Sequence, residues 1–150
     1  MRLRWSVTVL AAALMLAVAP AAGAQPSSII GGWKGSIKAR GIPPWPVTVE
    51  VHRLTVGKRS GYMTFPLDKC AGILTLLRRS TRGFVLHYNE VGRGEFCDPG
   101  QAYADARLLM RLQDGQLFVR MTQPSPFNRV SEGLLRPSVC GASIRAQQAC

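Results

Sequence analysis

Residues 104–122 read ADARLLMRLQDGQLFVRMT and carry the clearest structural pattern in the chain. Apolar side chains recur at every second position: Ala104, Ala106, Leu108, Met110 and Leu112, and then Leu117, Val119 and Met121. A period of two is typical of a β-strand with one buried face. The Asp114-Gly115 pair between the two runs is a strong signal for a tight hairpin turn. The stretch therefore predicts two antiparallel strands that share an apolar face.

The same pattern extends along the chain in both directions. It predicts eight consecutive strands: Trp33–Lys38, Pro46–Val56, Gly61–Pro66, Gly72–Arg79, Gly83–Val91, Gln101–Leu112, Gln116–Thr122 and Arg129–Leu135. Gly, Pro, Asn or Asp bounds each segment, and no helical period of useful length lies between them. Connections this short leave no room for crossover helices, so we expect an antiparallel meander.

One face of the predicted sheet is apolar and the other is polar and basic. The polar side carries Lys34, Lys38, Glu50, His52, Arg107, Arg111 and Arg120. A flat sheet with one dry face needs a second layer, which the sequence does not supply. We therefore expect an all-β fold, an eight-stranded antiparallel up-and-down barrel, with a β-sandwich as the alternative. An outer-membrane barrel with its apolar face toward lipid also fits the alternation, but the strands are short for it and aromatic girdles are missing.

The first 24 residues have the three parts of a secretory signal peptide. Arg2 and Arg4 precede an apolar run of about 14 residues, which is short for a membrane span, and Ala22-Gly23-Ala24 forms a cleavage site. We expect a signal peptide at 1–24, a barrel domain at 25–138 and a C-terminal tail at 139–150. Removing the two arginines lowers the formal charge from +11 to +9. The chain is thus expected to be periplasmic or secreted, with no membrane segment after processing.

Four cysteines, Cys70, Cys97, Cys140 and Cys150, lie beyond the signal peptide. An even count in an exported chain favours two disulfides, with three connectivities possible. In an up-and-down barrel the odd-numbered connections share one end, and here they are the longer ones. We call this the loop-rich end. Cys70 and Cys97 both fall there, which favours their pairing and leaves Cys140 with Cys150 to tie the tail. No pair has C-x-x-C spacing and neither histidine stands near a cysteine, so we expect no metal site and no cofactor.

Two partial resemblances are carried by short motifs. Gly31-Gly32-Trp33 is similar to the G-x-W signature of lipocalins, in which an arginine after the last strand packs over the tryptophan. The resemblance implies a cation–π contact between Arg136 and Trp33 at the closed end.

The second resemblance covers more of the chain. The succession Trp33-x-Gly35, Pro46 to Val49, Gly61 to Pro66, Cys70-x-Gly72-x-Leu74, Glu90 to Cys97 and Gly133-x-Leu135 resembles an exported bacterial domain. That domain occurs alone and as the extracellular part of some bacterial serine/threonine kinases. The resemblance implies a Cys70–Cys97 disulfide and a sensor or binding role, and it implies no reaction.

The candidate ligand site lies at the loop-rich end. Glu90 and Tyr88 share a strand face, and both are candidate ligand contacts. Glu90 is expected to point inward as the polar anchor of a pocket or as a structural partner for an arginine or loop amides. Trp45, Phe96 and Phe127 lie on the connections and are candidate ligand contacts. The alternative for Trp45 and Phe127 is that they close the barrel end as lids.

The basic polar face suits anionic surroundings. Of 17 cationic residues beyond the signal peptide, 13 are arginine, against 8 acids. The cationic residues are spread along the chain, apart from a group of three at Arg78, Arg79 and Arg82. Aromatic residues that could stack on bases are not expected between them. We therefore expect no specific nucleic-acid site. A solubilising surface is the simpler interpretation.

The sequence predicts a binding protein and no enzyme. His52 and His87 have no serine, cysteine or acid at a spacing that predicts a triad, and no catalytic motif occurs. The leading hypothesis is an exported protein that holds a small apolar or amphipathic envelope ligand at the barrel mouth. The alternative is a protein-interaction module, such as an inhibitor or envelope-stress partner, that uses the mouth loops without an internal cavity. An interior filled by Phe84, Tyr88, Met110 and Met121 would favour the alternative.

Overall fold

The computed structural model describes residues 28–91 and 105–138 as an eight-stranded antiparallel barrel. The strands are β1 (Gly31–Ala39), β2 (Trp45–Val51), β3 (Arg59–Phe65), β4 (Cys70–Ser80), β5 (Gly83–Glu90), β6 (Ala106–Gln113), β7 (Gln116–Thr122) and β8 (Val130–Ser138). The predicted signal peptide at 1–24, the tail at 139–150 and the fifth connection lie outside the described residues.

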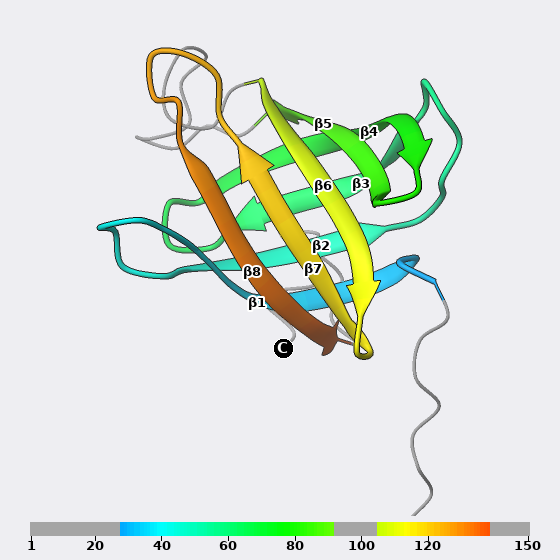
Figure 1. Cartoon of the computed structure of the whole chain (residues 1–150), viewed down its shortest axis with the longest axis horizontal. Coiled ribbons are helices and arrows are strands. Elements are labelled where there is room, and N and C mark those ends of the chain that lie inside the picture. The colour runs from blue at the N-terminus through cyan, green and yellow to red at the C-terminus, as the bar shows by residue number, and fades with distance from the viewer. Residues whose placement is uncertain (1–27, 92–104, 139–150) are drawn as a thin grey trace, which may run out of the picture.

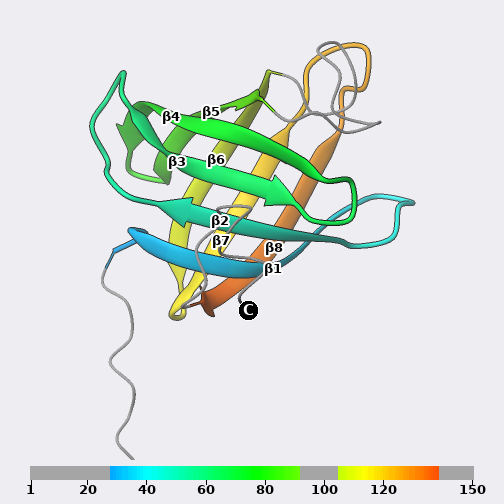
Figure 2. The same ribbon diagram turned by 180° about the vertical axis from the view of Figure 1, so that it is seen from behind.

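Each strand pairs with its neighbours in the chain, and β1 pairs with β8 to close the barrel. In Figure 1 β6, β7 and β8 cross the front of the barrel, and Figure 2 shows β2, β3 and β4 on the opposite side. The predicted up-and-down barrel is confirmed, and the sandwich alternative is wrong because the sheet has no free edge. Among the described residues, no helix is long and apolar enough to cross a membrane.

The hairpin of β6 and β7 forms as the sequence predicts. Gln113 pairs with Gln116, and the two turn residues Asp114 and Gly115 both have positive φ, 51° and 73°. Two positive φ values define the turn whose twist matches that of the flanking strands, and Asp-Gly tolerates them at low cost.

The apolar face of the sheet is the inner one. Val47, Val49, Leu108, Leu117 and Val119 are 0–1% exposed. Phe84 and Leu112, which were assigned to the same face, are only partly buried against this core. Because the apolar side chains point inward, the arrangement with an apolar lipid-facing exterior is wrong.

Two strands depart from the predicted pattern. The prediction of a second strand reaching Val56 is wrong, because β2 ends at Val51. The backbone N–H groups of His52 and Arg53 both donate to the Ser60 carbonyl, at 2.8 and 3.3 Å, which ends the regular ladder. In β4 the register shifts between Leu76 and Arg78, so Leu77 is an extra residue and is 42% exposed.

Candidate functional site

The interior of the barrel is filled with side chains. Leu76, Leu86, Leu108 and Met110 are 0% exposed and Met121 is 1% exposed. A side chain beside a water-sized void would show accessible surface, so the described core residues enclose no such space. A ligand held inside the barrel would have to displace these side chains.

Tyr88 belongs to this core and not to a ligand surface. The residue is 0% exposed, and its ring lies over Gly72 of β4, where a Cβ atom would come within 2.2 Å of Cε2. Its ring also meets Phe65 edge-on, with centroids 6.0 Å apart. Packing from β3 and β4 therefore covers Tyr88, which was a predicted ligand contact, and leaves its side chain without exposed surface.

Glu90 points inward at the loop-rich end, as the alternation predicts. It lies opposite Gly72 at the end of β5, and both of its carboxylate oxygens are buried. Because the space beneath it is filled by the Tyr88 ring, Glu90 sits at the top of the core and not at the base of a deep pocket.

Trp45 and Phe127 differ in their surroundings. Trp45 begins β2 and is partly buried against the core, and the Arg129 guanidinium carbon lies 5.8 Å from its ring centroid. Trp45 therefore resembles a lid on the barrel end. Phe127, in the connection between β7 and β8, is 41% exposed. Phe96, the third predicted contact, lies outside the described residues.

Two exposed apolar residues at the same end were missed by the sequence analysis. Leu67, in the connection between β3 and β4, is 72% exposed, and Val91, which follows β5, is 54% exposed. Together with Phe127 they define the mouth patch. The place of Leu67 and Phe127 in the chain gave a signal, since both follow predicted strand ends on odd-numbered connections. Val91 was predicted as the last residue of the fifth strand, and β5 ends one residue earlier, at Glu90.

The predicted contact between Arg136 and Trp33 is wrong. Trp33 points inward and is 1% exposed, whereas Arg136 lies opposite Lys34 on the outer surface. Residues of opposite pleat parity cannot share a face of the sheet. Trp33 instead donates its indole N–H to the carbonyl of Ile29 at 2.8 Å, and Ile29 is itself buried at this closed end.

Arginine–aromatic pairs occur on the surface, contrary to the prediction that aromatic residues are absent there. In the part of the chain that the structure describes, four such pairs lie within 6 Å: Arg59 with Tyr62 at 4.1 Å, Arg79 with Phe84 at 5.9 Å, Arg111 with Phe118 at 4.8 Å, and Arg129 with Trp45 at 5.8 Å. Cross-strand register brings Arg79 to Phe84 and Arg111 to Phe118, which the order of residues in the chain does not show. Arg59 and Tyr62 lie three residues apart on β3.

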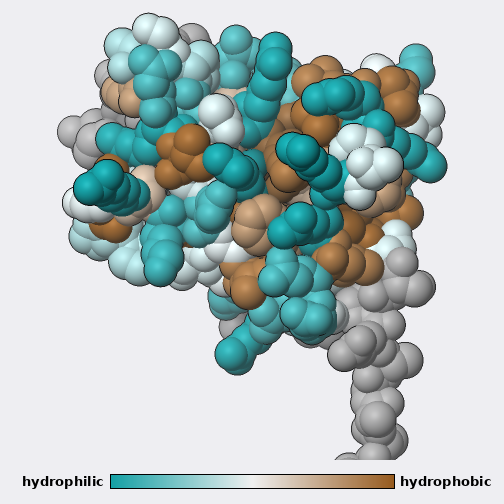
Figure 3. All heavy atoms as spheres, in the orientation of Figure 1, coloured by the Kyte–Doolittle hydropathy of each residue, from teal (hydrophilic) through white to brown (hydrophobic). Residues whose placement is uncertain are grey.

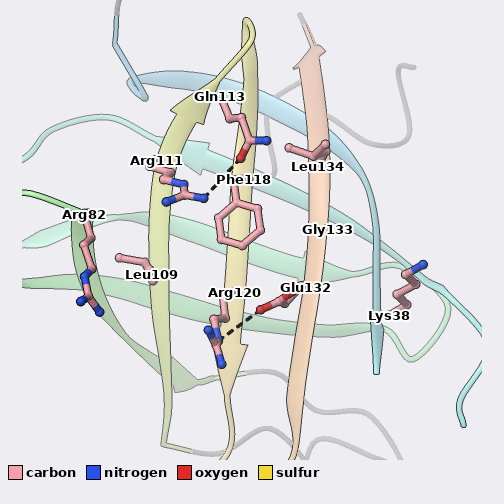
Figure 4. Close-up of a pocket in the computed structure, with 10 residues that line it drawn as sticks. All are labelled: Lys38, Arg82, Leu109, Arg111, Gln113, Phe118, Arg120, Glu132, Gly133 and Leu134. Atoms are coloured by element: carbon pink, nitrogen blue, oxygen red, sulfur yellow. Dashed lines mark hydrogen bonds and ion pairs between the residues drawn. The ribbon is translucent and has the colours of Figure 1, made fainter. Parts of the chain in front are cut away.

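The third of these pairs lies in a hollow on the outer surface of β6, β7 and β8, which we call the outer groove. The groove has a volume of about 760 Å³, and its lining comprises Lys38, Arg82, Leu109, Arg111, Gln113, Phe118, Arg120, Glu132, Gly133 and Leu134. Figure 4 shows most of these residues on β6, β7 and β8, with Arg82 of the β4–β5 turn on one side and Lys38 of β1 on the other. Figure 3 shows hydrophilic and hydrophobic residues interleaved on this side of the molecule. From the sequence, these cations were predicted to be dispersed over one face of the sheet, and no common hollow between them was predicted.

Each histidine lies beside a carboxylate. His87 Nε2 contacts the Asp105 side chain, and His52 Nε2 is 3.6 Å from a carboxylate oxygen of Glu50. The sequence predicted no acid at a triad spacing from either histidine, and the structure places one carboxylate beside each. In the described part of the chain, no group of three or more His, Cys, Asp or Glu residues is arranged to hold a metal ion.

Cys70 begins β4 at the loop-rich end, where it is 2% exposed and carries no free thiol. Cys97, Cys140 and Cys150 lie outside the described residues. The pairing of Cys70 with Cys97 stays a prediction.

Comparisons with family models, with curated proteins and with solved structures give no match to this chain.

Proposed function

We propose that this chain is an exported, non-enzymatic binding protein that engages a partner protein through the mouth patch, with the barrel as a solid scaffold. The observation that carries the proposal is the filled interior. Tyr88, Met110 and Met121 occupy the space that an enclosed ligand would need, and they are at most 1% exposed. Of the two binding roles compatible with the sequence, the one without an internal cavity fits this packing.

The mouth patch supplies the contact surface. Leu67, Val91 and Phe127 are exposed by 72%, 54% and 41%, and all follow strand ends on one side of the barrel. Apolar side chains on loops over a rigid scaffold are a common way to build a recognition surface, because binding buries them without unfolding the core. Arg129 beside Trp45 adds a cation at the border of this patch.

A small amphipathic envelope ligand at the mouth is the second candidate. It is favoured by Glu90, whose buried carboxylate oxygens lie at the top of the core next to the loop-rich end. Such a ligand would bind over Glu90 and Phe127 rather than inside the barrel.

Native mass spectrometry of the protein purified from its own host separates these roles. The proposal predicts a complex with a second protein that is lost in the Phe127→Ser and Leu67→Ser variants. Leu77→Ser and Val56→Ser are matched controls, because their side chains are similarly exposed, at 42% and 55%, away from the mouth patch. These two variants should retain the complex.

Two results would contradict the proposed role. A bound small molecule that dissociates in the Phe127→Ser variant would support the second candidate instead. A protein complex lost equally in all four variants would show that the mouth patch is not the contact surface.

A further inference from the structure

The outer groove has a different chemistry from the mouth patch. Its floor is apolar and consists of Leu109, Phe118 and Leu134, which lie on three adjacent strands. Phe118 is the cross-strand neighbour of Arg111 on one side and of Leu134 on the other. Leu134 is 45% exposed. The register therefore produces an apolar strip that begins beside an arginine.

Cations surround this strip. Lys38, Arg82, Arg111 and Arg120 line the groove, and Glu132 is the one acid among its lining residues. Glu132 lies 3.2 Å from Arg120 and is also the cross-strand neighbour of Lys38, so one carboxylate faces two cations. The lining keeps a formal excess of three positive charges, which favours an anionic ligand.

Arg111 is held in a position to bind an anion. Its guanidinium lies 4.8 Å from the Phe118 ring centroid and donates to the Gln113 side-chain oxygen at 3.4 Å, a contact drawn in Figure 4. Stacking on the ring and the bond to a neutral amide fix the side chain without neutralising its charge. The other N–H donors of its planar guanidinium group have a geometry that suits a phosphate group.

We infer that the outer groove binds one anionic amphiphile, a molecule with a phosphate head group and an alkyl chain. The phosphate contacts Arg111 and Arg82, and the chain covers Phe118 and Leu134. A purely polar anion would leave the apolar floor exposed, and an uncharged apolar molecule would leave the excess positive charge of the groove without a counter-charge. The volume of about 760 Å³ suits a single molecule of this kind.

Other occupants fit the groove less well. A peptide cannot add to the sheet here, because every strand is paired on both sides in the closed barrel. A single-stranded nucleic acid needs several aromatic platforms for its bases, whereas Phe118 is the one aromatic residue among the groove's lining residues.

Octyl phosphate below its micelle-forming concentration is a suitable probe, with binding followed by calorimetry on the full chain. Inorganic phosphate supplies the head group alone, and octyl glucoside supplies the alkyl chain without charge. We expect octyl phosphate to bind at least about tenfold more tightly than either, since both parts of the groove are then used. Raising the salt concentration should weaken octyl phosphate binding.

The charged part of the groove is tested by two matched arginines on β6. Arg111→Gln should weaken octyl phosphate binding by about tenfold, the loss expected for one charge-assisted hydrogen bond. Arg107→Gln removes the same charge from the same strand and the same face, but Arg107 does not line the groove. Its binding should match that of the unsubstituted protein.

The apolar part is tested by two leucines. Leu134→Ser should weaken octyl phosphate binding by about fivefold, because the alkyl chain loses apolar surface to cover. Leu77→Ser on β4, with an exposure of 42% against 45% for Leu134, should have no effect. Phe127→Ser should also leave octyl phosphate binding unchanged. The experiment can therefore refute binding in the groove without refuting the proposed function of the mouth patch, and the reverse.

Four results would overturn the inference. Equal weakening by Arg107→Gln and Arg111→Gln would show nonspecific attraction by the net charge. Equal binding of octyl glucoside would show a merely apolar patch. Tighter binding of a single-stranded oligonucleotide would assign the cations to nucleic acid. Binding to anionic phospholipid vesicles without binding of soluble octyl phosphate would show a bilayer-surface contact instead.

Discussion

The contact between Gly72 and Tyr88 gives a sharp test of the packed interior. In a Gly72→Ala variant the new Cβ would lie 2.2 Å from Cε2 and 2.3 Å from Cζ of the Tyr88 ring. The ring cannot simply move away, because it is fully buried and meets Phe65 edge-on. Overpacking of this kind costs about 1–3 kcal/mol, and the lower entropy of the unfolded chain returns about 0.4–1 kcal/mol. The net loss of folding free energy should be about 1–2 kcal/mol.

Urea unfolding followed by tryptophan fluorescence measures this loss, and a fall in Tm of about 4–8 °C should accompany it. The control is a double-mutant cycle with Tyr88→Leu, which removes the ring from above Gly72. In that background Gly72→Ala should cost almost nothing, so the two substitutions should couple by about 1 kcal/mol or more. An equal cost in both backgrounds, or no cost in either, would refute the packing of Tyr88 over Gly72.

Three further predictions concern the remaining contacts. Trp33→Phe removes the indole N–H that donates to Ile29 and leaves a buried carbonyl unpaired, so it should lower the unfolding free energy by about 1–3 kcal/mol in chemical denaturation; an unchanged midpoint would contradict the bond. Arg120 and Glu132 are about half exposed, at 50% and 47%, so a double-mutant cycle on their side chains should give a coupling below about 1 kcal/mol, and a larger value would mean that the groove is drier than described. Gly115→Val places a β-branched residue at a φ of 73° and should cost at least about 1 kcal/mol in thermal unfolding, whereas a neutral effect would rule out the described turn.

Much of the fold could be predicted because the signals are local. The alternation in residues 104–122 and the Asp114-Gly115 turn identify the β6–β7 hairpin, and the same period along the chain predicts eight strands. The closure of the sheet into a barrel could be inferred because the sheet has one apolar face and the sequence predicts no other element to cover it. These inferences need only the period of the strand and the solvent preference of the side chains.

The errors in the fold arose where backbone pairing departs from the regular ladder. In β4 the register shifts between Leu76 and Arg78, which makes Leu77 an extra residue, and no local signal in the sequence indicates this shift. The end of β2 was missed because the Ser60 carbonyl accepts hydrogen bonds from two backbone N–H groups there. No side chain in the sequence indicates this arrangement.

The candidate sites were harder to predict because they depend on register. Arg111 and Phe118 lie seven residues apart in the chain, and only the hairpin pairing makes them neighbours. Leu134 joins them through β8, and Arg82 comes from the turn between β4 and β5. The contact of Trp33 with Arg136 failed for the same reason, since a one-residue difference in register decides which face an arginine occupies.

The described interior of the barrel is filled, and our proposals place ligands on its outside. Methyl NMR of the leucines during a titration with octyl phosphate tests this placement most directly, because Leu108 and Leu109 are neighbours on β6 that face opposite sides. We expect the methyl signals of Leu109 and Leu134 to shift and those of Leu108 and Leu117 in the core to stay in place. Shifts of the two core leucines with unchanged outer leucines would place the ligand inside the barrel and contradict the account.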